Sequence, residues 1–91
     1  MKIISYQKFK NTHEYKSNKP KNTKRIYSAM SALGYTIIFQ DSIEVGEKSI
    51  NVISEILTYT DIPQGRVVYV RTKDNWGLPF LVLFYKKDGE I

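Results

Sequence analysis

The residues best suited to chemistry in this chain are cations gathered near its N-terminus. Around one aromatic residue, Tyr15, the sequence places Lys10, Lys16, Lys19, Lys21, Lys24 and Arg25. Ammonium and guanidinium groups bind phosphate oxygens, and a tyrosine ring can stack on a base. These seven side chains are therefore the predicted contacts to a polyanion.

Positive charge is concentrated in this part of the chain. Residues 1–25 contain eight cations and one acid, whereas the other 66 residues contain six cations and eight acids. A local positive field attracts polyanions and speeds their encounter, but it specifies neither a fold nor a reaction. Nucleic acid is the expected partner, RNA more than DNA, and an acidic host protein is the alternative. A solvated lysine-rich loop that only keeps the protein soluble is the simplest other interpretation.

Several of these cations surround the start of a predicted helix over Asn22–Leu33. Cations are unfavourable at this end of a helix dipole, but a docked phosphate would reverse the sign of the interaction. The predicted helix offers few side chains that read base edges, so we expect contacts mainly to phosphates. Tyr27 and His13 are further stacking candidates close by in sequence.

Other kinds of chemistry find little support. The sequence has no cysteine and one histidine, His13, which excludes a thiolate zinc site and makes a histidine-based metal site implausible. Its five glycines are scattered and form no phosphate-binding loop. We therefore expect no catalytic residue, metal or cofactor, and the sequence favours a non-enzymatic protein.

One enzymatic alternative stays open. Ribonuclease toxins of the RelE type cleave RNA with arginine, lysine and tyrosine side chains, although no motif of that family is present. A comparable set here would consist of Tyr69, Arg71, Lys73, Tyr85 and Lys86. The simpler interpretation is that lysines at strand edges protect an apolar hairpin from aggregation.

The elements that must position these side chains follow from the hydrophobic pattern. The expected order is a strand over Lys2–Phe9, a polar basic loop over 10–21, a helix over Asn22–Leu33 that ends before Gly34, a strand over Tyr35–Gln40, a helix over Ser49–Thr60, and strands over Arg66–Thr72 and Phe80–Lys87. The β-branched residues of 49–60 also allow a hairpin around Gly46.

The pattern predicts a single α+β domain over residues 1–91, with an antiparallel sheet of about four strands packed against two helices in the order β-α-β-α-β-β. The last two strands are apolar on both faces, and two short helices can cover one of them, so the other face predicts a homodimer. Trp76, in the turn between these strands, is expected to fold back over the core, and an interface anchor is the alternative interpretation.

The cellular context is inferred from composition. The longest apolar run, Leu78–Tyr85, is far too short to span a membrane, and the N-terminal residues do not resemble a signal peptide. We expect a cytoplasmic protein without membrane contact. Abundant lysine, isoleucine and tyrosine suggest an A/T-rich genome. We therefore expect a phage or mobile-element regulator that binds nucleic acid, or alternatively inhibits a host enzyme or toxin by binding it.

Overall fold

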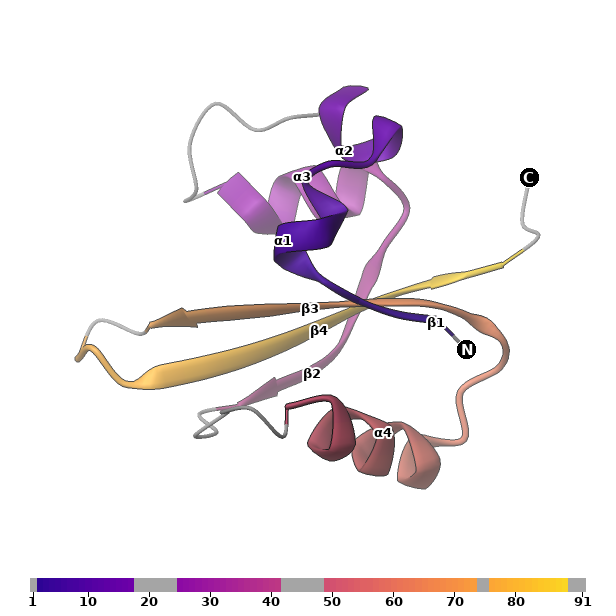
Figure 1. Cartoon of the computed structure of the whole chain (residues 1–91), viewed down its shortest axis with the longest axis vertical. Coiled ribbons are helices and arrows are strands. Elements are labelled where there is room, and N and C mark those ends of the chain that lie inside the picture. Colours follow the sequence, from indigo (N-terminus) through magenta and orange to yellow (C-terminus); the bar gives the residue numbers. More distant parts are fainter. Residues whose placement is uncertain (1, 18–24, 42–48, 74–75, 89–91) are drawn as a thin grey trace.

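The computed structural model describes residues 2–17, 25–41, 49–73 and 76–88 (Figure 1). Its elements in chain order are β1 (Lys2–Ser5), α1 (Tyr6–Phe9), α2 (His13–Ser17), α3 (Ile26–Ala32), β2 (Thr36–Asp41), α4 (Ser49–Thr60), β3 (Gly65–Lys73) and β4 (Pro79–Lys87). The predicted α+β class and four strands are confirmed, and α1 and α2 are two short helices additional to the expected order.

The four strands form one sheet in the order β1-β3-β4-β2. β4 pairs antiparallel with both β3 and β2, whereas β1 pairs parallel with β3. The sheet is therefore mixed and mostly antiparallel, which agrees with the predicted antiparallel sheet except for β1, whose pairing with β3 is parallel. A parallel pair requires a long crossover, which here contains α1 to α4 and β2.

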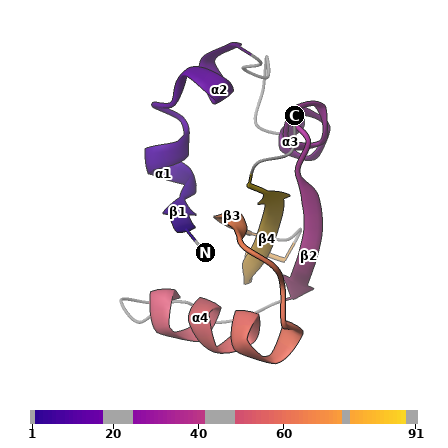
Figure 2. The ribbon, with the colours of Figure 1, turned by 90° about the vertical axis from the view of Figure 1, so that its right-hand side faces the viewer.

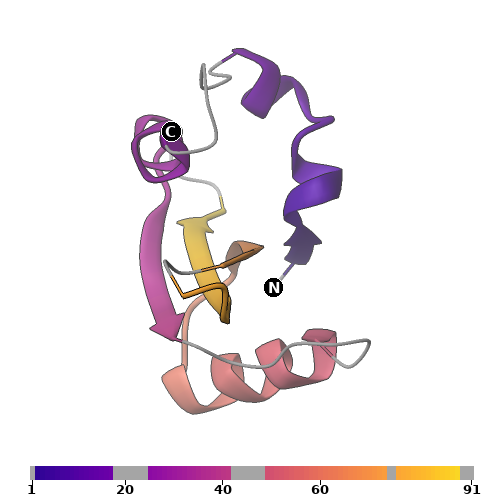
Figure 3. The same cartoon turned by 90° about the vertical axis from the view of Figure 1, so that its left-hand side faces the viewer.

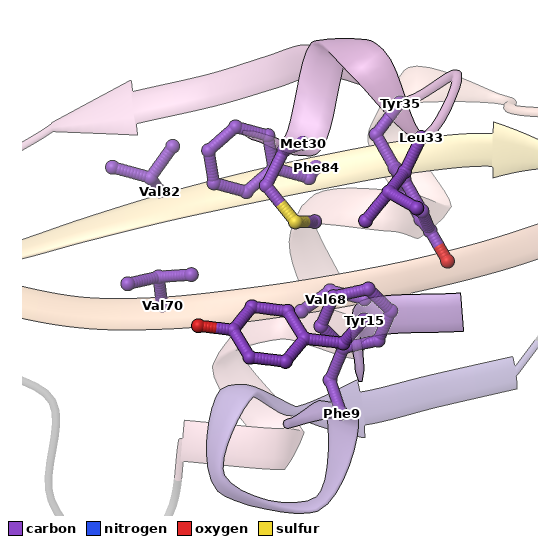
Figure 4. Packing of buried hydrophobic residues seen from close by; sticks show 9 residues of the cluster. All are labelled: Phe9, Tyr15, Met30, Leu33, Tyr35, Val68, Val70, Val82 and Phe84. Carbon is purple, nitrogen blue, oxygen red and sulfur yellow. The ribbon is translucent and has the colours of Figure 1, made fainter. Parts of the chain in front are cut away.

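Helices lie on both faces of this sheet. α1, α2 and α3 are on one side and α4 is on the other (Figure 2), and the view from the opposite side shows the same two layers (Figure 3). Under the N-terminal helices lies a buried cluster of Phe9, Tyr15, Met30, Leu33, Tyr35, Val68, Val70, Val82 and Phe84 (Figure 4). Alternation along the strands sends neighbouring residues to opposite faces, so the hairpin needs both layers.

The homodimer prediction assumed that one apolar sheet face has no cover. Ile53 and Leu57 of α4 pack against Val67 and Leu83 on that face. The assumption is wrong, because α4 takes the face opposite the N-terminal helices instead of sharing a layer with α3. Dimerisation thus loses the reason on which it was predicted.

The first expected strand ends early. β1 stops at Ser5, whose side chain accepts a hydrogen bond from the backbone N–H of Lys8 and caps α1. The turn into α1 directs Phe9 into the core, where it is fully buried. Alternation over Lys2–Phe9 resembled a longer strand because the burial of Phe9 depends on partners distant in sequence, such as Tyr35.

The expected basic loop over 10–21 also contains structure. Thr12 accepts a hydrogen bond from the backbone N–H of Tyr15, and His13–Ser17 form α2. Tyr15 is buried, with 6% of its surface exposed, and its ring meets Phe9 edge-to-face. The expectation of a polar loop is therefore wrong for residues 10–17, which contain a helix and a core residue. The rest of the expected loop lies outside the described residues.

The two longer helices match their predicted patterns. α3 ends at Ala32, and Gly34 just beyond it has a φ of +87°; the N–H groups of Gly34 and Tyr35 donate to the carbonyls of Ser31 and Met30. α4 has the predicted bounds, and its buried residues Ile53 and Leu57 lie one turn apart. The expected start of the first long helix, at position 22, lies outside the described residues.

Candidate nucleic-acid interface

The β3–β4 hairpin has two chemically different ends. At the end away from its turn, Arg66 and Lys86 are directly paired across the strands. Arg66 Nη1 lies 2.8 Å from Glu14 Oε2, Lys86 Nζ lies 2.9 Å from Glu14 Oε1, and the Tyr35 hydroxyl donates to Glu14 Oε2 at 3.2 Å. These four residues, the Glu14 cluster, join α2 to the sheet.

The Glu14 cluster is built for structure and not for proton transfer. Burial raises the pKa of Glu14, but the hydrogen bond and charge of Lys86, the Tyr35 hydrogen bond and the charge of Arg66 hold it below its ordinary value. Burial and the nearby Glu14 charge raise the pKa of Tyr35 to about 12. At neutral pH the carboxylate is charged and the phenol protonated, so neither is suited to general acid–base catalysis.

The opposite end of the hairpin, its turn end, extends past the helices (Figure 1). β1 makes its last pair at Ser5 with Tyr69, but β3 continues to Lys73 and pairs there with Pro79 of β4. Because the chain leaves the sheet at Ser5 to form α1, a pocket of about 430 Å³ lies beside this part of β3. It is lined by Ser5, Tyr6, Gln7, Tyr69, Arg71, Thr72, Lys73 and Pro79.

This pocket is positively charged. Arg71 and Lys73 are exposed and form no ion pair with a described residue, and the described lining contains no acid. The two cations alternate along β3, so they lie on one face of the strand, about 7 Å apart along it. That separation allows both to contact one phosphate or two neighbouring ones.

Lys10 connects the predicted basic segment to the pocket. Its Nζ lies 5.2 Å from the centroid of the Tyr6 ring, and Tyr6 forms part of the pocket wall. The Tyr6 hydroxyl shares a hydrogen bond with that of Tyr15 at 3.1 Å. Tyr15 thus supports the wall from the core, and its burial contradicts the predicted role as an exposed stacking residue.

The other predicted contacts are not gathered in this pocket. Lys16 is exposed on α2, and Arg25 is exposed immediately before α3, where its side chain makes no capping hydrogen bond. Lys19, Lys21 and Lys24 lie outside the described residues. Of the further stacking candidates, Tyr27 is 42% exposed and packs edge-to-face on Phe84, and His13 is exposed on α2 beside Ser17.

Trp76 is where the structure departs most from expectation. Its side chain is 87% exposed in the turn, so the prediction that it covers the core is wrong. The turn end lies beyond the helices, and Leu78 is 54% exposed next to it. Sequence reasoning considered Trp76 an interface anchor only as a second interpretation, because the length of hairpin left uncovered depends on where β1 ends.

The residues considered for a ribonuclease site are divided between the two ends. Arg71 pairs with Leu81, whereas Lys86 pairs with Arg66, which places the two cations about 16 Å apart along the hairpin. Tyr85 donates hydrogen bonds to the carbonyls of Pro63 and Gln64 at 3.1 and 3.3 Å. The set does not converge on one reacting position, as a catalytic constellation must.

Comparison with protein-family models, curated proteins and solved structures found no match for this chain. In the part of the chain that the structure describes, no group of three histidine, cysteine or acidic residues could hold a metal ion. No helix among the described residues is both long and apolar enough to cross a membrane.

Proposed function

We propose that this protein binds nucleic acid, RNA in preference to DNA, as a small accessory or regulatory protein. The observation that supports this most is the turn-end pocket, in which Arg71 and Lys73 stand without an acid in the described lining and Lys10 lies against the Tyr6 wall. Phosphate oxygens are the natural ligands of such cations, since they replace the missing carboxylates as acceptors.

The distribution of ion pairs supports the same site. Glu14, the one acid of residues 1–25, is bound to Arg66 and Lys86 and partly neutralises them. The acid therefore compensates the end of the hairpin away from the pocket. Arg71 and Lys73 at the turn end, in contrast, form no ion pair with a described residue, and a positive groove of this kind follows a phosphate backbone.

Preference for RNA rests on the absence of a recognition helix among the described elements. α3 has seven residues and is about 10 Å long, and it exposes Tyr27, Ser28 and Ser31. These side chains supply few of the paired donors and acceptors that distinguish bases in the major groove of DNA. RNA-binding proteins more often recognise single strands and loops, for which phosphate contacts and stacking suffice.

Binding across a salt series tests the proposal. Labelled single-stranded RNA and duplex DNA are titrated with nuclease-treated protein by fluorescence anisotropy. The paired substitution Arg71→Glu and Lys73→Glu should lower RNA affinity at least about tenfold and reduce the slope of log K against log salt by about 1.4. No binding of either polymer at low salt would refute the proposal.

A matched variant separates a local site from general attraction. Lys2→Glu with Lys87→Glu makes the same change in net charge, but Lys2 and Lys87 are exposed at the other end of the hairpin, beside Arg66 and Gly65. The control should lose much less affinity than the turn-end variant. Equal losses would mean that net charge, and not the pocket, drives binding.

The basic segment is tested separately. Reversing Lys16, Lys19 and Lys21 to glutamate should also abolish RNA binding while the fold persists, because the core residue of this region is Tyr15. Unchanged affinity would remove these three lysines from the interface.

If the protein binds no polymer and a pulldown retains one acidic host protein, the inhibitor alternative replaces the proposal. We place either activity in the cytoplasm.

A further inference from the structure

The indole of Trp76 is a large apolar surface that the fold leaves in water. It is 87% exposed, and it is the single tryptophan of the sequence. Burying an apolar side chain of this size stabilises a fold, and this position forgoes that stabilisation. An isolated exposed apolar residue is common on protein surfaces, so exposure alone does not indicate a ligand.

Its surroundings are what distinguish Trp76. Lys73 and Pro79 form the last pair of the hairpin, so Trp76 lies in the five-residue turn directly beyond the charged pocket. Two residues lie between it and Lys73, so three Cα–Cα steps limit the distance between their Cα atoms to about 11 Å. An aromatic ring, two cations and the pocket beside Tyr69 are therefore within reach of one short segment of ligand.

Charge complementarity selects the chemistry of that ligand. A phosphate-bearing chain satisfies Arg71 and Lys73, and a base provides a flat surface for the indole. In a duplex both faces of each base are occupied by its stacked neighbours, whereas an unpaired base offers a face to a side chain. This pairing of cations with an exposed ring is the arrangement by which proteins bind single strands without reading their sequence.

We propose that the turn end of the β3–β4 hairpin binds an unpaired segment of RNA, with Trp76 stacked on a base and Arg71 and Lys73 on adjacent phosphates. This inference rests on the proposed function and adds to it the strandedness of the ligand and the residue that recognises it. The pocket beside Tyr69 receives the backbone that leads away from the stacked base.

The test uses the fluorescence of Trp76 as a direct reporter, since the protein contains no other tryptophan. A labelled oligouridylate and a duplex RNA of equal length are titrated, with anisotropy reporting binding and indole emission reporting stacking. We expect quenching by the oligouridylate and much less quenching by the duplex. Trp76→Ala should weaken binding of the single strand about 5- to 150-fold, equivalent to about 1–3 kcal/mol, and Trp76→Phe should retain most of the affinity.

A matched control is available near the C-terminal end of α4. Tyr59 of α4 is 83% exposed, and Tyr59→Ala removes an aromatic ring of similar accessibility far from the turn end. This variant should bind the oligouridylate like the unaltered protein. Equal losses in the Trp76 and Tyr59 variants would overturn the assignment of stacking to the turn.

The outcomes separate this inference from the proposed function. Absence of any anisotropy change would refute nucleic-acid binding itself. Binding of the oligouridylate without quenching, and with Trp76→Ala unaffected, would leave nucleic-acid binding intact but refute the stacking role. Equal quenching by duplex RNA would refute the preference for unpaired bases. Stronger quenching by polyglutamate than by RNA would overturn the inference in favour of an acidic protein partner.

Discussion

Replacing Glu14 by glutamine removes the one negative charge that two hairpin cations share. Arg66 and Lys86 each lie within 3 Å of a carboxylate oxygen of Glu14 and directly opposite each other on β3 and β4. The variant keeps an oxygen that can accept from Tyr35, but it leaves two positive charges facing one another across the strands. Like charges in this position destabilise a sheet.

The size of the effect follows from exposure. The side chains of Arg66, Lys86 and Glu14 are 32%, 37% and 22% exposed, so water screens both ion pairs. A charged hydrogen bond shielded from water contributes roughly 1.5–3 kcal/mol, and an exposed ion pair contributes about 1 kcal/mol at most. Because both ion pairs of Glu14 are partly exposed, the contribution of each lies towards the lower value. Two pairs and the cross-strand repulsion give a loss of about 1.5–2.5 kcal/mol, or about 6–20 °C in the melting midpoint.

Urea denaturation of both proteins across pH measures this loss. Because the cluster holds the folded pKa of Glu14 below its ordinary value of 4.5, its stabilisation is complete above that pH and disappears as the pH falls through the lower folded pKa. The two proteins should differ at pH 7 and converge in acid. Glu55→Gln, on the exposed face of α4, is the control and should be neutral at both. A Glu14→Gln difference below about 0.5 kcal/mol at pH 7, or one that persists undiminished in acid, would refute this account.

Three further expectations concern the core and the assembly. Gly65→Ala should lose about 1–3 kcal/mol in thermal denaturation, because a Cβ there would meet the Tyr85 ring and lie 2.5 Å from a backbone oxygen; unchanged stability would contradict this packing. Phe9→Ala and Ile53→Ala should lose about 3–5 and 2–5 kcal/mol in urea denaturation, and a neutral result for either would mean that its helix does not close the core. Light scattering at micromolar concentration should give the mass of one chain, since helices pack against each face of the sheet; a dimer would contradict this expectation.

The elements that sequence predicts well are those whose own side chains decide the outcome. Over Ser49–Thr60 the β-branched residues favour a strand, but the spacing of Ile53 and Leu57 favours a helix, and burial against the sheet decides for the helix. The hairpin of β3 and β4 is likewise set by two apolar runs and a turn between them, and its bounds lie within a residue of the prediction.

The elements that the sequence predicts poorly are those whose structure depends on residues far away along the chain. Whether Tyr6–Phe9 continue a strand or turn into α1 depends on Phe9 finding Tyr35, 26 residues further along the chain, with ring centroids 5.6 Å apart. The parallel register of β1 leaves no local signal at all. The candidate site shares this difficulty, because the cations are visible in the sequence, whereas the pocket exists only because β1 ends before β3 does.

The parallel pairing of β1 with β3 also sets the timing of folding. Ser5 and Tyr69 are partners 64 positions apart. A ribosome adds about 5–20 residues per second, so β1 waits about 3–13 s for the strand that receives it. In refolding, the short turn lets β3 and β4 meet within microseconds, whereas β1 must close the longest loop in the sheet. One of the first strands synthesised is therefore among the last to join the sheet, and the turn-end pocket forms only when it does.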